Sequence, residues 1–181
     1  VINIVPGSVK GFSFPCFFLG AGFMLVETKA ITELALYYGS TWIVTSVVIA
    51  AILVMAFFAN LLVYKIGTPH IFKTYGLLFI TLLSGLFLTS INISSISSPL
   101  FNKLLMTFVI SFPIFFSGFA FSNELNKSPS ITVAFSSNII GAMIGGFLEY
   151  NSMYFGFKSL YIFALLMYIF AFFSSLILSK K

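Results

Sequence analysis

The stretch Gly20–Tyr38, which reads GAGFMLVETKAITELALYY, combines two features that seldom occur together. It begins as an apolar run and then places Glu27, Lys29 and Glu33 close to one another. A charge at the centre of a bilayer costs roughly 2.5–3.5 kcal/mol on insertion scales, so such residues form pairs, face a protein interior or carry function. The stretch therefore predicts a membrane-spanning helix with a polar role.

The whole chain shares the apolar character of that stretch. Of its 181 residues, 60% are hydrophobic and 7% are charged, and the mean hydropathy is +1.12. Because a soluble domain carries about 25% charged residues, this chain cannot cover a water-exposed surface. We therefore expect an integral membrane protein folded as one all-α domain over residues 1–181. The chain starts at Val1 rather than Met, and we expect it to be a fragment of a longer protein.

Six apolar segments are each long enough for a transmembrane helix, which needs ~20 residues to cross about 30 Å of hydrocarbon. None shows the strict alternation of a membrane β-strand. Polar breaks separate them, among them Ser90–Pro99 and Ser122–Pro129, which we expect to be loops. Pro15 and Pro113 fall inside apolar runs, where we expect kinks. The predicted helices are residues 12–38, 41–64, 71–91, 100–121, 130–148 and 155–178.

The lysines predict the orientation of this polytopic bundle. Six helices place both termini on one side, and that side holds six lysines, whereas the other side holds Lys103 and Lys158. Cytoplasmic loops carry an excess of Lys and Arg, so we expect both termini in the cytoplasm and the protein in the inner (plasma) membrane. Six helices with both ends inside also match the size of one half of many two-half transporters. The six lysines are Lys10, Lys65, Lys73, Lys127, Lys180 and Lys181.

Within the first predicted helix, Lys29 and Glu33 lie four residues apart and therefore share a face. We favour a structural pair in which they neutralise each other, and the alternative is that Lys29 and Glu33 belong to a substrate or proton site. Glu27 lies roughly 120–160° from both around the helix, so it has no partner on its own helix. It is either a structural acceptor for a neighbouring helix, with Asn60 and Asn138 as candidate partners, or a proton or cation site.

A second candidate stripe lies in the fifth segment. Asn138, Gly145 and Glu149 fall on one face, with Gly141 and Gly146 beside it. Small residues four apart let two membrane helices approach closely, so helix packing is the favoured interpretation of the three glycines. The alternative is a substrate path, for which Asn138 and Glu149 are the candidate site residues.

Several functional classes have no signature in the sequence. Cys16 is the single cysteine and His70 the single histidine, so we expect neither a disulfide within the chain nor a metal site. No glycine-rich nucleotide loop and no G-x-S-x-G motif occurs, so we expect no cofactor and no self-contained enzyme. The lysines are scattered between apolar runs, which makes the lipid bilayer, rather than nucleic acid, the expected partner.

The segment Gly22–Glu27, GFMLVE, followed by Gly39, resembles the membrane region of spermidine-synthase-like (aminopropyltransferase-related) bacterial multi-helix proteins. Asn138–Tyr168, which contains GGFLEY from Gly145 to Tyr150, resembles the tail of the same family. These segments cover less than half of the chain. The resemblance implies a major-facilitator-like half, with further transmembrane helices and a nucleotide-fold enzyme domain elsewhere in the full-length protein.

Two functions stay open at this point. The chain is either a transporter-like module that binds or moves a small polar solute, with Glu27 as the key group, or a structural membrane anchor for an attached cytoplasmic enzyme domain. A water-accessible cavity that reaches Glu27 would favour the transporter. A Glu27 sealed by a hydrogen bond from a neighbouring helix would favour the anchor.

Overall fold

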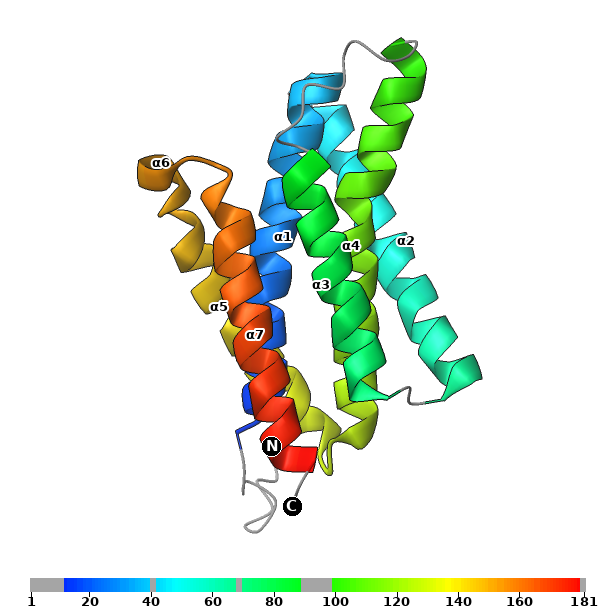
Figure 1. The fold of residues 1–181 in the computed structure, drawn as a ribbon, viewed down its shortest axis with the longest axis vertical. Helices are drawn as coiled ribbons and strands as arrows, with labels where there is room; N and C mark the ends of the chain where they lie inside the picture. The colour runs from blue at the N-terminus through cyan, green and yellow to red at the C-terminus, as the bar shows by residue number, and fades with distance from the viewer. Residues whose placement is uncertain (1–11, 40–41, 68–69, 89–98, 180–181) are drawn as a thin grey trace, which may run out of the picture.

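The structure, a computed structural model, describes residues 12–39, 42–67, 70–88 and 99–179, and every regular element in these ranges is a helix (Figure 1). Five helices are long and apolar enough to cross a membrane, and a sixth contributes the shorter apolar stretch Ile71–Phe87. The expected all-α membrane-type bundle is thereby confirmed. The helices are α1 (Phe14–Tyr38), α2 (Trp42–Ile66), α3 (Ile71–Leu88), α4 (Pro99–Lys127), α5 (Ile131–Glu149), α6 (Ser152–Phe155) and α7 (Ser159–Ser179).

Local chemistry sets several helix ends. Pro15 lies in the first turn of α1, where its missing N–H has no helical partner to lose, so the kink expected at Pro15 is wrong. Gly39 ends α1 with a φ of 95°, which suits glycine, and its N–H donates to the carbonyl of Ala35. Ser130 caps α5, because its side chain accepts a hydrogen bond from the N–H of Val133.

The largest difference from the predicted boundaries lies at the end of α4. A loop is expected over Ser122–Pro129, yet α4 remains helical through Pro113 and continues to Lys127. At 1.5 Å per residue its 29 residues span about 43 Å, more than the ~30 Å of a hydrocarbon core. The polar residues of its last turns are therefore part of the bundle. The sixth predicted segment also differs, because the short α6 precedes α7, which begins at Ser159.

Four helices form a ring in which each contacts two neighbours. Going round the ring, α1 packs against α4, α4 against α3, α3 against α7, and α7 against α1. The diagonal helices α4 and α7 have little direct backbone contact and face each other across the interior. Outside the ring, α2 packs mainly on α4 and α5 mainly on α1 (Figure 1). The start of α1 and the end of α7 lie at the same end of the bundle (Figure 1).

The tightest helix pair is α1 with α5, and glycines on both helices allow the close approach, Gly20 on α1 and Gly141 and Gly145 on α5. A Cβ added at Gly141 would collide with the carbonyl oxygen of Phe17, and one added at Gly145 would lie 2.5 Å from the carbonyl oxygen of Ala21. These contacts fit the packing role predicted for Gly141 and Gly145. The same role predicted for Gly146 is not found, because a Cβ there would meet no atom within 4 Å.

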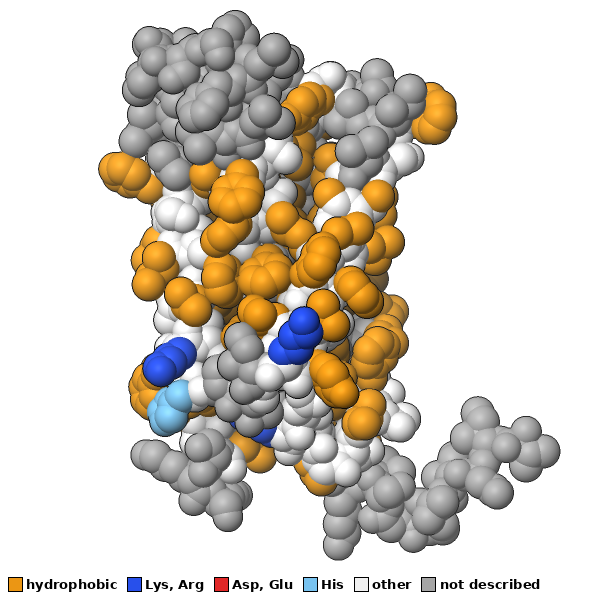
Figure 2. All heavy atoms as spheres, turned by 90° about the vertical axis from the view of Figure 1, so that its right-hand side faces the viewer, with side chains coloured by type: hydrophobic (Ala, Val, Ile, Leu, Met, Phe, Trp, Pro, Cys, Tyr) orange, Lys and Arg blue, Asp and Glu red, His pale blue; other side chains and the backbone are white. Residues whose placement is uncertain are grey.

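The outer surface is suited to lipid. Exposed large hydrophobic side chains extend along α2 and α5, including Leu53, Phe57, Met143 and Phe147. Figure 2 shows the side of the bundle on which α2 lies: hydrophobic side chains cover its middle, and the Lys and His side chains gather toward one end. That distribution is expected when apolar side chains face hydrocarbon and charged ones face water.

Candidate functional site inside the helical ring

One face of α7 carries polar groups at regular intervals into the ring. Tyr161, Tyr168 and Ser175 are all buried and lie seven residues apart, which places successive groups about 10 Å apart along the helix. Ala164 and Ala171 fill the positions between them and are also buried. The polar groups therefore form a line along the interior of the ring, on a helix that otherwise has an apolar sequence.

The opposite helix, α4, supplies partners in the same register. The hydroxyl of Tyr168 donates to Ser117 Oγ at 2.7 Å, and the hydroxyl of Ser175 donates to Glu124 Oε1 at 2.8 Å. Ser117 and Glu124 are also seven residues apart, and α4 and α7 run in the same direction, so one register explains both bonds. One further step brings Tyr161 to the level of Ile110, whose side chain has no hydrogen-bonding group.

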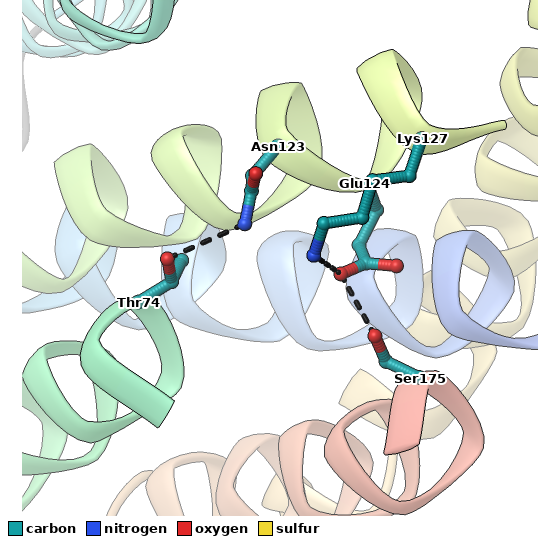
Figure 3. Close-up of polar contacts among 5 residues, drawn as sticks. All are labelled: Thr74, Asn123, Glu124, Lys127 and Ser175. Atoms are coloured by element: carbon teal, nitrogen blue, oxygen red, sulfur yellow. Dashed lines mark hydrogen bonds and ion pairs between the residues drawn. The ribbon is translucent and has the colours of Figure 1, made fainter. Parts of the chain in front are cut away.

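Glu124 is the centre of a polar cluster near the end of the bundle where α4 ends (Figure 3). Its Oε1 also receives Lys127 Nζ at 3.2 Å, so two donors meet on one carboxylate oxygen. The Glu124 side chain is 8% exposed, whereas that of Lys127 is 38% exposed. Beside this group, the buried Asn123 donates from Nδ2 to Thr74 Oγ1 of α3 at 3.4 Å.

Tyr75 of α3 completes this cluster. Its side chain is buried and lies near Glu124 and near Cys16 of α1. Its hydroxyl faces Ser175 of α7, although no hydrogen bond of good geometry joins the two. All four helices of the ring thus contribute a side chain to this region, from positions far apart in the sequence.

The predicted ion pair lies in the other half of the ring. Lys29 Nζ and Glu33 Oε2 are 2.7 Å apart, and their side chains are only 6% and 12% exposed, which confirms the pair. The ammonium also lies 5.4 Å from the centre of the Tyr161 ring, within the range of a cation–π contact. The buried hydroxyl of Tyr161 has no hydrogen-bond partner among the described residues.

Glu27 points elsewhere. It is half-buried, and no hydrogen bond or ion pair joins it to another residue in the described ranges. Gly22 and Lys29 mark the side of α1 that contacts Tyr168 and Tyr161, and Glu27 lies roughly 140–160° from that side. Neither suggested partner reaches it: Asn60 is exposed on α2, and the backbone of Asn138 lies against Gly20, two turns away along α1.

The stripe predicted on α5 faces α1. Glu149 Oε2 accepts a hydrogen bond from the Thr28 hydroxyl at 3.1 Å, so the last residue of α5 is tied to the middle of α1. Just before α1 begins, the backbone N–H of Ser13 donates to Ser137 Oγ of α5 at 3.0 Å. The small residues and these two bonds describe a packing interface.

Sequence reasoning missed the Glu124 cluster. The dense polar run after Phe121 favours a loop, and a predicted loop does not indicate which of its side chains are buried. The signal that was present is the spacing of Glu124 and Lys127, three residues apart, which suits an ion pair on a helix. The partners Ser175 and Thr74 come from distant helices, and no local pattern indicates them.

No group of three or more His, Cys, Asp or Glu side chains placed to hold a metal ion occurs in the part of the chain that the structure describes. Comparison with protein-family models, with curated proteins and with solved structures returned no match.

Proposed function

We propose that this chain is a transporter-like membrane module that binds or moves a small polar solute through the interior of the ring formed by α1, α3, α4 and α7. The observation that carries this proposal is the line of buried polar groups across that interior, from Lys29, Glu33 and Tyr161 through Tyr168 to the Glu124 cluster. In this proposal the module is one half of a larger transporter-like protein in the inner membrane, with both termini cytoplasmic.

The free-energy cost of burying polar groups in membrane helices favours the transporter-like role over that of a membrane anchor. Apolar helices alone satisfy the requirements of a membrane anchor, since their backbone groups bond internally. Each buried polar or charged group in a membrane helix costs free energy unless it is paired, and such residues mark substrate or ion pathways. A stripe in which polar groups recur every seven residues on α7 and meet matching groups on α4 fits a pathway.

Glu27 is a second candidate group in this proposal. A half-buried carboxylate in a membrane span, with no partner among the described residues, has a side available to a solute, a proton or further helices of the same protein. Glu27 lies on a different side of α1 from Lys29 and therefore outside the ring. In this proposal it would bind a ligand on the outer side of α1 rather than along the ring interior.

The structural anchor is the second candidate function, and one observation favours it. Lys29 and Glu33 neutralise each other, Glu124 and Lys127 do the same, and α1 and α5 are locked together at Gly141. Such internal pairing is also what a stable scaffold requires. In this case the chain would hold the enzyme domain that its resemblance to spermidine-synthase-like proteins implies.

Uptake into proteoliposomes separates the two functions. The full-length protein is reconstituted with radiolabelled spermidine as a cationic probe and radiolabelled glutamate as an anionic probe. We expect saturable uptake of one probe, lowered roughly three- to tenfold by Tyr168→Phe, since a hydrogen bond contributes about 0.5–1.5 kcal/mol. Ser136→Ala, at an exposed position of α5, is the matched control and leaves uptake unchanged. Uptake of neither probe above protein-free liposomes would favour the anchor.

A further inference from the structure

The Glu124 cluster contains polar atoms whose contacts are not complete. Both donors, Ser175 and Lys127, bind Oε1 of Glu124, and the second carboxylate oxygen points away from them (Figure 3). No hydrogen bond from the described residues reaches that second oxygen, Oε2. The nearby Tyr75 hydroxyl is buried and also lacks a hydrogen bond of good geometry. An unused acceptor and an unused hydroxyl therefore lie in one buried cluster.

The two ion pairs among the described residues differ in burial and in the distance between their charged atoms. Lys29 and Glu33 are both buried, and their charged atoms are 2.7 Å apart. Glu124 is equally buried, but its partner Lys127 is more than one-third exposed and its ammonium is 3.2 Å away. Lys127 is the last residue of α4, at the end of the bundle that also carries Lys65 and Lys73. It can therefore leave the carboxylate and stay hydrated, which Lys29 cannot do.

We propose that Glu124 is a proton-binding site for which Lys127 serves as a releasable counter-ion. A proton from the aqueous phase binds Oε2 and turns the carboxylate into a neutral carboxylic acid. The Lys127 ammonium keeps its own proton, loses its attraction to the site and turns toward water. The protein as a whole gains the one positive charge of the proton taken up, the ion pair between Lys127 and Glu124 opens, and the new O–H bond is the only covalent change.

The groups around Glu124 favour this exchange. From its own helix it faces Lys127, from α7 the hydroxyl of Ser175, from α3 the hydroxyl of Tyr75, and from α1 the thiol of Cys16. A phenol and a thiol are neutral at pH 7, so Lys127 is the opposite charge that faces the carboxylate. Ser175 and Tyr75 can each hydrogen-bond to the carboxyl in either protonation state, because a hydroxyl both donates and accepts.

This inference deepens the proposed transport role, since a proton site inside the ring would couple solute movement to a proton gradient, but the binding test does not depend on transport. Infrared difference spectra of the full-length protein in nanodiscs are recorded across a pH series, with protons as the only ligand. We expect carboxylic acid absorption that grows as the pH falls, with a component that is missing from Glu124→Gln. Glu149→Gln, which removes a carboxylate from the packing interface between α1 and α5, is the matched control and retains that component.

A second variant keeps the test decisive if Glu124→Gln does not fold. Lys127→Gln leaves Glu124 in place and removes the opposing charge, so the Glu124 component of the band should appear at higher pH than in the wild type. Lys158→Gln, an exposed lysine at the other end of the bundle, should leave it unmoved. A carboxylic acid band that is identical in the wild type and in Glu124→Gln, or a Glu124 component that Lys127→Gln does not move, overturns the proposal.

Transport measurements then separate this inference from the function on which it rests. Solute uptake that stays equally pH-dependent in Glu124→Gln rejects Glu124 as the coupling group and leaves the transporter proposal standing. A titrating Glu124 in a protein that takes up neither spermidine nor glutamate supports the proton site and rejects the transport role.

Discussion

Charged residues in this chain are tolerated inside a membrane-type bundle because each acidic side chain on the ring interior has a specific neighbour. Glu33 has Lys29 one turn away, and Glu124 has Lys127 on its own helix and Ser175 opposite. Removing one member of a buried pair leaves the other charge without compensation, which costs far more than the pair contributes when intact.

Glu33→Gln is therefore expected to destabilise the protein by about 3 kcal/mol, because it strands the buried Lys29 ammonium. Unfolding in mixed detergent and SDS micelles measures the loss. Glu27→Gln is the matched control: it removes a carboxylate from the same helix without breaking an ion pair of the described residues, so its effect should be small. Combining Glu33→Gln with Lys29→Met should restore most of the stability. Equal losses from Glu33→Gln and Glu27→Gln would contradict this account.

The contrast between Glu33 and Glu124 also shows how far residues can be predicted from sequence. Four-residue spacing on a helix fixes a distance before the fold is known, so the Lys29–Glu33 pair follows from the sequence alone. Ser175 and Thr74 approach α4 only because α3 and α7 complete the ring, and tertiary contacts of this kind leave no periodic trace. The sequence also could not show whether Glu27 has a partner, since a helical wheel predicts the face on which a residue lies but not which residue it contacts.

At the scale of elements, two different interfaces hold the bundle together. Helices α1 and α5 are in backbone contact, so small side chains govern their packing. Helices α4 and α7 are bridged across the ring by side chains, so matched polar groups in a seven-residue register govern theirs. The first interface was accessible to sequence reasoning through the spacing of Gly141 and Gly145. The second was not, because its register depends on how α4 and α7 align.

Gly145→Ala tests the first interface. A methyl group there would lie 2.5 Å from the carbonyl oxygen of Ala21, so the helices must separate, at a cost of about 1–3 kcal/mol. Gly146→Ala adds the same methyl group where no atom lies within 4 Å, and should be neutral or slightly stabilising because alanine favours the helix. Melting temperatures of both variants in detergent measure the difference. A Gly145→Ala protein as stable as Gly146→Ala would show that α1 and α5 do not approach this closely.

At the scale of the whole molecule, the bundle has one lysine-rich end. Lys65 and Lys73 lie on either side of the connection between α2 and α3, and Lys127 ends α4, so all three fall at the end where α1 begins. Lys158 lies at the opposite end, between α6 and α7. The alternating direction of the long helices was predictable from hydropathy, because each break reverses the chain. We expect the lysine-rich end to face the cytoplasm, and this expectation rests on charge asymmetry alone.

Cysteine labelling in intact cells tests that orientation. Cys16 is buried and is first replaced by Ala, so that a single engineered thiol reports its side of the membrane. Tyr154 on α6 and His70 before α3 are both exposed, and they lie at opposite ends of the bundle. If the lysine-rich end is cytoplasmic, a membrane-impermeant maleimide should modify Tyr154→Cys in intact cells, and His70→Cys only after the cells are permeabilised. The reverse pattern would place Lys127 and the Glu124 cluster on the outer side, so that Glu124 would exchange protons with the extracytoplasmic phase.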